Sequence, residues 1–327
     1  MKTLGVRILV VLMTMTSMCA SLVGSAHSDT LEVVVYPGFG ASYFVLEGRL
    51  IEARGGEPEA ADDSWFVNLK RTLRRLINDE KKNVALRVRL GTGEWRTVTD
   101  VEGYFRIEKS LPSGSTAGWQ AVEVATESGD AKTMGALLAV PEENRLGIIS
   151  DIDDTILVSD VADKPGLVRK TLLVNYAQRQ AVAGTPEFYT RLAQRNPRPE
   201  AAPIFYLSAS PRQLHSGIQT FLDKNAFPRG VLITKKVTDD KTSDPLTDQV
   251  KYKVERIEQL LAALPQVRFV LVGDDGESDP ETYDKIRRRH LDRIEAVWIR
   301  KVNLDKTRRV YLEQRDLAAA LTEERKQ

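Results

Sequence analysis

Short apolar runs rich in β-branched residues recur after residue 145, and stretches with helical periodicity separate them. Near-continuous apolar strands are typical of a parallel sheet that is covered on both faces. Strands that alternate with helices favour the same architecture, so we expect an α/β domain over residues 144–310. The predicted strands are Arg145–Ser150, Ala202–Leu207, Gly230–Lys235, Val267–Val272 and Ala296–Val302. The predicted helices are 166–181, 185–195, 211–225, 247–264 and 280–292, with a helical tail over 311–327.

Residues 30–143 have a different pattern, in which short β-type runs are separated by glycine-containing turns. The turn at Thr99–Gly103 opens onto an alternating strand, and this step resembles those in small β-sandwich domains of the transthyretin or carboxypeptidase-regulatory kind. We therefore expect a small β-sandwich-like domain before the α/β domain. Its predicted strands include Leu31–Tyr36, Phe44–Leu46, Arg49–Ile51 and Val84–Leu90.

One segment of this β-rich region, residues 65–82, has the pattern of an amphipathic helix with a basic face. Such a helix can lie on an anionic membrane, and this peripheral contact is one interpretation. The plainer interpretation, which we favour, is a helix that packs on its own domain and exposes its basic face. Its basic residues are Lys70, Arg71, Arg74 and Arg75.

The first 26 residues have the features of a cleaved export signal. Lys2 and Arg7 precede the apolar run Ile8–Met18, and small residues follow up to Ala26. The expected location is therefore the periplasm or the exterior of the cell. Lipid attachment at Cys19, the only cysteine, is an alternative that we rank below simple cleavage. Cleavage would remove two of the 47 basic residues and none of the 46 acidic ones, and a near-neutral protein argues against nucleic-acid binding.

Polar residues follow three of the predicted strands directly. In open parallel sheets, ligands bind beyond the carboxyl ends of the strands, so these residues are expected to meet at one edge. A lysine of the predicted helix 247–264, either Lys251 or Lys253, can reach the same edge. The strand-end residues are Asp151, Asp153, Asp154 and Thr155 after the first strand, Ser208 after the second, and Asp274, Asp275 and Asp279 after the fourth.

These residue types suit phosphoryl transfer. A carboxylate can attack phosphorus and hold the phosphoryl group as a mixed anhydride, and a second carboxylate can protonate the leaving alcohol. Because nucleophile and phosphate repel one another, a hard cation such as Mg²⁺ must bridge them. A serine hydroxyl and a lysine ammonium would then offset the charge of the phosphoryl oxygens.

The ordered set resembles the four motifs of the haloacid dehalogenase superfamily. This resemblance implies a Rossmann-like parallel sheet, with Asp151 as nucleophile and Asp153 as general acid and base. It implies phosphate binding by Thr155, Ser208 and Lys253. The implied Mg²⁺ ligands are Asp151, the backbone carbonyl of Asp153, Asp274 and Asp279.

A closer resemblance is to the actin-patch-associated phosphatidate phosphatase family. It rests on the runs Ser150–Ile156, Phe205–Pro211 and Phe269–Tyr283, and the spacing to Pro265 favours Lys253 over Lys251. The sequence departs from this family at Ala209, Arg212 and Asp275; an aromatic residue is common where Arg212 stands. These departures bear on the substrate more than on the chemistry.

Simpler interpretations exist for some of these residues. Asp279 precedes Pro280, and this order is also typical of a helix N-cap followed by a first-turn proline. Both lysines could face solvent, and Asp154 could be an ordinary turn residue. For Asp151 and Asp153 a simpler interpretation is weak, because carboxylates directly behind a buried strand cost stability unless they bind something.

The intervals between the motifs leave no room for a large cap domain, although residues 157–182 could form a small helical lid. An open site suits lipids at a membrane surface or macromolecules. With the export signal and the family resemblance, phosphatidate is the first choice of substrate. One alternative is a broad-specificity exported phosphomonoesterase. Another is a surface-binding module whose β-sandwich recognises lipid, glycan or protein.

Overall fold

The computed structural model describes residues 30–53, 81–158, 179–237, 244, 248–305 and 307–322. The predicted export signal with Cys19 lies outside these residues, as do nearly all of the predicted helix 65–82 and most of the lid segment 157–182. Within the described part, every helix is too short or too polar to cross a membrane.

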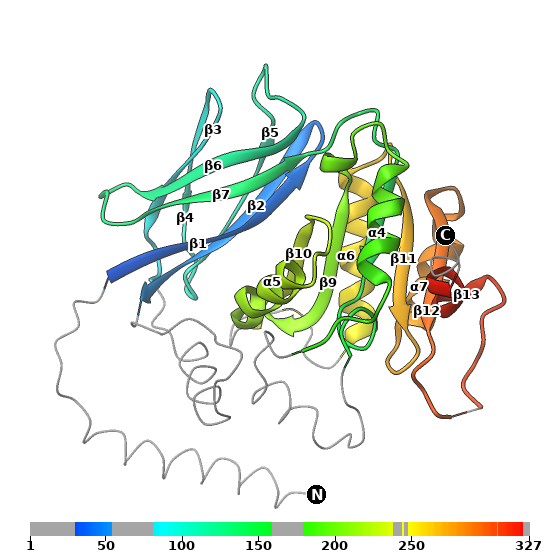
Figure 1. The fold of residues 1–327 in the computed structure, drawn as a ribbon. Coiled ribbons are helices and arrows are strands. Elements are labelled where there is room, and N and C mark those ends of the chain that lie inside the picture. The colour runs from blue at the N-terminus through cyan, green and yellow to red at the C-terminus, as the bar shows by residue number, and fades with distance from the viewer. Residues whose placement is uncertain are drawn as a thin grey trace, which may run out of the picture.

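The N-terminal half folds as one β-rich domain, on the left in Figure 1. Its seven described strands hydrogen-bond in the order β4-β3-β6-β7-β1-β2-β5. All neighbours are antiparallel except β1 and β7, which pair in parallel. The strands are β1 (Thr30–Gly40), β2 (Tyr43–Ala53), β3 (Ala85–Leu90), β4 (Gly93–Val98), β5 (Tyr104–Ser110), β6 (Gly118–Thr126) and β7 (Lys132–Ala139).

This sheet curls until its two edge strands approach one another. The Thr97 hydroxyl of β4 lies 3.5 Å from the Arg106 carbonyl oxygen of β5. Across the interior, Trp95 packs edge-on against Phe44, with ring centroids 5.2 Å apart. The expected sandwich of two sheets is therefore replaced by a single, nearly closed sheet, because seven strands with ordinary twist bring their own edges together.

The second half contains a six-stranded sheet in which every pair is parallel. The parallel arrangement was predicted, but the sixth strand lies in the segment 311–327 that was predicted to be helical, because Gln314–Asp316 pairs with the strand before it. The strand order of the sheet is β10-β9-β8-β11-β12-β13. The chain therefore adds β9 and β10 on one side of β8, and then returns to add β11, β12 and β13 on the other side. The strands are β8 (Leu146–Ser150), β9 (Ile204–Pro211), β10 (Val231–Lys235), β11 (Arg268–Asp274), β12 (Ile294–Arg300) and β13 (Gln314–Asp316). Such an order is typical of doubly wound sheets, which bind ligands where the winding direction reverses.

Helices cover both faces of this sheet, as predicted. Successive residues of β8 alternate between the faces: Ile148 packs with α4, α5 and α8, whereas Ile149 packs with α6 and α7. All five residues of β8 are buried, which accounts for its mostly apolar sequence. The helices are α4 (Thr185–Gln194), α5 (His215–Lys224), α6 (Gln249–Ala263), α7 (Asp279–Arg289) and α8 (Leu317–Thr322), with short 3₁₀ turns η3 (Pro199–Ala201), η4 (Arg212–Leu214) and η5 (Leu291–Arg293).

The β-rich domain packs on the face that also carries α6. Leu138 and Val140, at and just beyond the end of β7, join the same buried cluster as Phe205 and Ile257. Phe39 of β1 meets Phe205 of β9 edge-on at 5.0 Å. The two domains therefore share an apolar core. Figure 1 shows the β-rich domain lying beside β9 and β10, where this core forms.

Candidate active site

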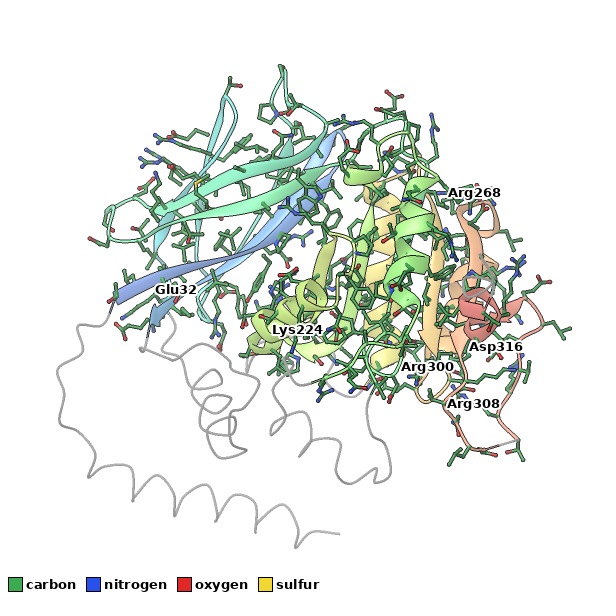
Figure 2. The ribbon with its side chains drawn as sticks, viewed as in Figure 1. Glu32, Lys224, Arg268, Arg300, Arg308 and Asp316 are labelled. Atoms are coloured by element: carbon green, nitrogen blue, oxygen red, sulfur yellow. The ribbon has the colours of Figure 1, made fainter. Side chains whose placement is uncertain are left out.

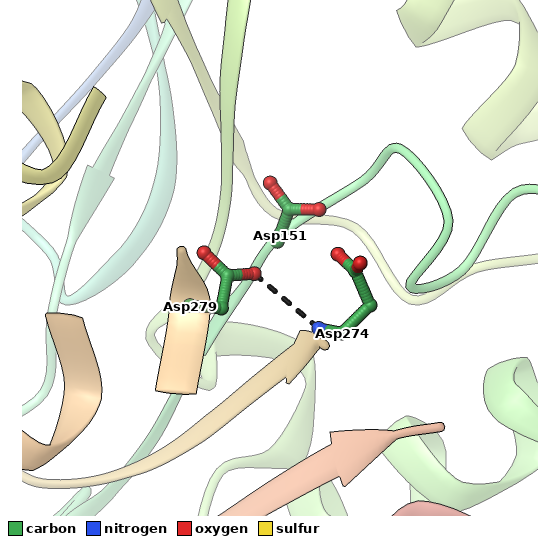
Figure 3. Close-up of side chains that lie close together, drawn as sticks. All are labelled: Asp151, Asp274 and Asp279. Carbon is green, nitrogen blue, oxygen red and sulfur yellow. Dashed lines mark hydrogen bonds between the residues drawn. The ribbon is translucent and has the colours of Figure 1, made fainter. Parts of the chain in front are cut away.

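Three aspartates converge where the winding direction of the parallel sheet reverses. Asp151 follows the last residue of β8, Asp274 ends the neighbouring β11, and Asp279 begins α7. Figure 3 shows the three side chains around a common space. One ligand atom of each lies within 4.8 Å of the others, and all three residues are buried. Because β8 and β11 are adjacent and parallel, the sheet itself brings these carboxylates together.

Lys253 connects two of these aspartates from the first half of α6. Its Nζ donates to Asp151 Oδ1 at 2.7 Å and also to Asp279 Oδ1. Only 3% of the Lys253 side chain is exposed, so the ammonium depends on these carboxylates for its polar contacts. The ammonium therefore lies beside the carboxylate that is predicted to act as nucleophile.

Asp274 and Thr155 complete the buried group. The Thr155 hydroxyl lies 3.1 Å from Asp151 Oδ2 and 3.3 Å from Asp274 Oδ2, and it can donate to either. The Asp274 backbone N–H donates to Asp279 Oδ2, and Asp274 Oδ1 accepts from the Gly276 N–H at 2.7 Å. Each carboxylate is thus oriented by at least one donor from the protein.

Asp153 points to a second set of groups. Its Oδ2 faces the hydroxyls of Ser208 at 3.4 Å and Ser210 at 3.3 Å, both on β9. Its Oδ1 lies 3.9 Å from Arg179 Nη1, and the Arg179 side chain is 9% exposed. The carboxylate of Asp153 therefore borders a polar space lined by hydroxyls and one guanidinium, next to the aspartate group.

The loop that carries Asp151 and Asp153 is fastened from several sides. Asp154 has a left-handed backbone, with φ of 57°, which turns the chain sharply after Asp153. The Asp154 carbonyl accepts from Arg300 Nη1, which is at the end of β12. Arg300 and Arg308 lie at the lower edge in Figure 2, where the strands end. Asp275 accepts from the backbone N–H groups of Val302 and Asn303, so it anchors the loop after β12.

The electrostatics of the group follow from burial and crowding. Burial and the neighbouring Asp151 and Asp279 carboxylates raise the pKa of Asp274 to about 8. Burial raises the pKa of Asp279 to about 7 even though Lys253 acts in the opposite direction. Burial alone would lower the pKa of Lys253, but Asp151 and Asp279 raise it well above its usual value.

The pKa of Asp153 is also raised, first by desolvation and then by Asp151, against the effect of Arg179. A raised pKa lets a carboxylic acid keep its proton nearer to neutral pH, as a general acid requires. One ammonium facing three crowded carboxylates leaves an excess of negative charge. A divalent cation held by oxygen atoms of Asp151, Asp274 and Asp279 would offset that charge, so these residues fit a hard metal ion.

The structure brings the predicted residues Asp151, Asp153, Thr155, Ser208, Lys253, Asp274 and Asp279 to one edge of the sheet. Lys251, the alternative lysine, is mostly exposed and lies 4.0 Å from Glu255. The N-cap position of α7 belongs to Ser278, whereas the carboxylate of Asp279 faces Lys253 and Asp274. The N-cap interpretation of Asp279 is therefore wrong.

Arg179 and Ser210 are the site residues that sequence reasoning missed. Ser210 belongs to the same run as Ser208, and a strand-end hydroxyl two residues further along was available as a signal. Arg179 follows a long segment without a motif, and nothing near it in the sequence indicates that it approaches Asp153.

A cavity of about 610 Å³ lies elsewhere, between the β-rich domain and α6. It is lined by Tyr36, Phe39, Glu47, Arg212, Ile233 and Leu260, among others, and by none of the carboxylates of the aspartate group. Its size is within the range of ligand pockets. We place the candidate active site at the aspartate group nevertheless, because the charged groups and the reversal of the winding coincide there.

Comparison with known proteins matches residues 146–301 to the model of the phosphatidate phosphatase APP1 catalytic domain. The phosphatidate phosphatase APP1 of Saccharomyces cerevisiae is 30% identical over 157 residues, which cover 47% of this chain and 26% of the yeast protein. An uncharacterised protein of Schizosaccharomyces pombe is 27% identical over 218 residues, 65% of this chain and 35% of its own length. The chain thus spans only about a quarter to a third of these relatives.

Among solved structures, a carbohydrate acetylesterase from Xanthomonas citri aligns over 84% of this chain and 68% of its own, with 10% identity and a TM-score of 0.30. A likeness at that level supports no inference about fold or function. The match to the catalytic-domain model covers β8 to β12 and all three residues of the aspartate group. Residues 146–301 are therefore similar to the catalytic domain of the APP1-like phosphatidate phosphatase family, a similarity that both the domain match and the yeast relative support.

Proposed function

We propose that this chain hydrolyses phosphate monoesters through an aspartyl-phosphate on Asp151, and that its substrate is phosphatidate, which it converts to diacylglycerol. The observation that carries the proposal is the buried Asp151–Lys253–Asp279 arrangement beside Asp274, at the point of the sheet where ligands are expected. The family match supports the phosphatidate phosphatase assignment, and the haloacid dehalogenase type of mechanism is part of the proposal.

In the first half-reaction, an Asp151 carboxylate oxygen attacks phosphorus, the ester P–O bond breaks, and Asp153 gives its proton to the leaving alcohol. Lys253 offsets negative charge next to Asp151, and Ser208 offers a hydroxyl to a phosphoryl oxygen on the side of Asp153. In the second half-reaction, Asp153 takes a proton from a water molecule that attacks the aspartyl-phosphate, and inorganic phosphate leaves. The raised pKa of Asp153 suits both proton transfers.

Asp151, Asp274 and Asp279 would hold Mg²⁺, together with the backbone carbonyl of Asp153 that the family resemblance implies. When bound, Mg²⁺ supplies positive charge that reduces the repulsion between nucleophile and phosphate. Thr155, which contacts both Asp151 and Asp274, then acts as a partner that orients two of the ligands.

We also propose that the protein is exported and meets its lipid substrate at a membrane surface. The support is the charged and apolar pattern of residues 1–26 and the family match to an enzyme that acts on a phospholipid. On the alternative interpretation of the basic segment 65–82, that segment would contribute peripheral contact with anionic lipid.

The test is phosphate release from phosphatidate in vesicles and from a soluble aryl phosphate, each with Mg²⁺ and with a chelator. Asp151→Asn removes the nucleophile, and Lys253→Met removes the ammonium beside it. Lys251→Met is the matched control, because it changes the same residue type two positions away on an exposed face of α6.

We expect Asp151→Asn to abolish turnover, Lys253→Met to reduce it by about a hundredfold or more, and Lys251→Met to leave it unchanged. Equal release by wild type and Asp151→Asn from both substrates would refute the enzyme and favour the surface-binding alternative. Equal efficiency on the aryl phosphate and on phosphatidate would replace the lipid assignment by a broad-specificity phosphomonoesterase.

A further inference from the structure

Two cationic side chains lie just beyond the ends of β9 and β10, and each contacts a carboxylate of the β-rich domain. Arg212 follows β9 directly, two residues after Ser210, and Lys236 follows β10. Their partners are Glu47 on β2 and Asp100 in the turn before β5. Both contacts lie on the side of the parallel sheet where the strands end, which is also the side of the aspartate group.

The Arg212–Glu47 pair is the more buried of the two. Arg212 Nη2 donates to Glu47 Oε2, and the Arg212 side chain is 6% exposed. The same guanidinium lies over the rings of Tyr36 at 5.2 Å and Tyr104 at 5.4 Å, both from the β-rich domain. Removing one partner of a buried ion pair leaves an uncompensated charge, so the position of Arg212 depends strongly on Glu47.

Arg212 is coupled to the hydroxyls that face Asp153 through a very short piece of chain. The Ser210 hydroxyl lies 3.3 Å from Asp153 Oδ2, and the Ser210 backbone N–H donates to Ser208 Oγ at 3.0 Å. Two residues further on, Arg212 Nε donates to the Thr234 carbonyl of β10 at 3.4 Å. A shift of Arg212 therefore moves the segment that presents both hydroxyls.

The Lys236–Asp100 contact fastens the end of the adjacent strand. Lys236 Nζ donates to Asp100 Oδ2 at 2.8 Å and lies 4.9 Å from the centre of the Tyr104 ring. The other oxygen, Asp100 Oδ1, accepts from the backbone N–H groups of Glu102 and Tyr104. Asp100 is thus itself held in place, and it presents a fixed anion to the chain that leaves β10.

The docking of the two domains has other sources besides these ion pairs. The apolar core around Phe39 and Phe205 lies between the domains. At the opposite end of the sheet, where the strands begin, Arg198 donates to the Ala117 carbonyl at 3.1 Å and Arg229 stacks over Trp119 at 4.0 Å. Contacts at both ends of the sheet hold the domains together, but only those at the strand ends adjoin the serine hydroxyls.

We propose that Glu47 and Asp100 are positioning residues for the active site: through Arg212 and Lys236, the β-rich domain sets the geometry of the Ser208–Ser210 segment. This inference rests on the proposed function, in which Ser208 binds the phosphoryl group. It gives the β-rich domain a role in turnover, and it gives Arg212 a specific partner in this chain.

The experiment compares Glu47→Gln and Asp100→Asn with Arg229→Ala, a control at the far end of the same interface. For each full-length variant we measure kcat and KM on a soluble aryl phosphate, the affinity for inorganic phosphate in the presence of Mg²⁺, and Tm. All assays are run at least ten degrees below the lowest Tm.

We expect Glu47→Gln to lower kcat by tenfold or more and to weaken phosphate binding by fivefold or more, and we expect Asp100→Asn to act in the same direction. Arg229→Ala should lower Tm and leave both other quantities within twofold of wild type. In the Arg212→Gln background, Glu47→Gln should have no further effect on kcat, because Glu47 acts through Arg212.

The outcomes separate this inference from the proposed function. If Asp151→Asn abolishes turnover while Glu47→Gln keeps kcat and phosphate affinity within twofold of wild type, the inference is overturned and the function stands. If wild type releases no phosphate from the ester but binds inorganic phosphate, and Glu47→Gln weakens that binding, the positioning role stands and the reaction is overturned. If wild type does neither, both are overturned.

Discussion

Replacing Lys253 by methionine tests whether the buried aspartate group is held together by charge. Methionine keeps most of the side-chain volume of lysine, so the substitution removes the ammonium with little change in packing. In the metal-free protein, the variant leaves Asp151 and Asp279 without the cation that contacts both carboxylates.

The least costly response of the folded protein is for one further carboxylate of the group to take up a proton. The ordinary pKa of an aspartate is 3.8, and holding a proton above that pH costs about 1.4 kcal/mol for each pH unit. The free energy of unfolding should therefore fall by about 4 kcal/mol at pH 7 and by about 2 kcal/mol at pH 5. Since the folded variant binds the extra proton, its deficit shrinks as the pH falls.

The assay is urea unfolding in the presence of a chelator at both pH values, for wild type, Lys253→Met and Lys251→Met. The control should stay within about 0.5 kcal/mol of wild type, because Lys251 is an exposed surface residue. A Lys253→Met deficit that is the same at pH 5 and pH 7, or no larger than that of Lys251→Met, would refute the electrostatic reasoning.

Four further predictions concern the residues that would hold the metal ion, the buried His215 and the basic segment 65–82. Thr155→Val removes the hydroxyl that contacts Asp151 and Asp274 and should weaken Mg²⁺ binding by about tenfold or more in calorimetry; unchanged affinity would mean that Thr155 orients neither ligand. The pKa values of Asp274 and Asp279 are raised to about 8 and about 7, so protons compete with the metal for these carboxylates. The Mg²⁺ affinity of wild type should therefore fall at least tenfold from pH 8.5 to pH 6, and an affinity that does not change with pH would contradict this. Burial lowers the pKa of His215 from 6.5 to about 4. The contribution of the neutral side chain to stability is therefore complete above pH 6.5 and is lost as the pH falls toward 4, by up to about 3 kcal/mol. His215→Phe should lose less stability than wild type between pH 7 and pH 4.5, and equal losses in the two proteins would be inconsistent with this. If residues 65–82 contact the membrane, changing Arg71, Arg74 and Arg75 together to glutamine should reduce binding to anionic liposomes and spare binding to neutral ones. Equal binding by wild type and the triple variant would instead support the interpretation that we favour, in which this segment packs on its own domain.

Local patterns in the sequence were sufficient for the parallel sheet and for the strand-end residues. An uninterrupted apolar strand is buried on both faces, and a carboxylate that follows it directly must lie at the edge of the sheet, so Asp151 and Asp274 could be placed without coordinates. The choice of Lys253 was also available from helical periodicity. Lys253 shares a face with the buried Ile257 and Leu260, whereas Lys251 shares one with Glu255.

Other features depend on contacts between distant segments, and no local pattern reports them. Arg212 and Glu47 are 165 positions apart, and their pairing arises only because the β-rich domain packs beside β9 and β10. Arg179 and Asp153 are likewise separated in the sequence, and only the folded structure brings their side chains near one another. The β-rich domain was predicted as a sandwich because alternation identifies strands but does not show which edges meet.

The sequence by itself therefore determined the chemistry that is available to this protein, since residue types and burial of each strand are encoded within a few neighbouring positions. Only the tertiary structure decided how the carboxylates, Lys253 and the serine hydroxyls are arranged around one another, and that the β-rich domain holds the strand-end segments beside them. The physical reason is that ion pairs and shared cores form between elements whose relative positions are set by the packing of the whole chain.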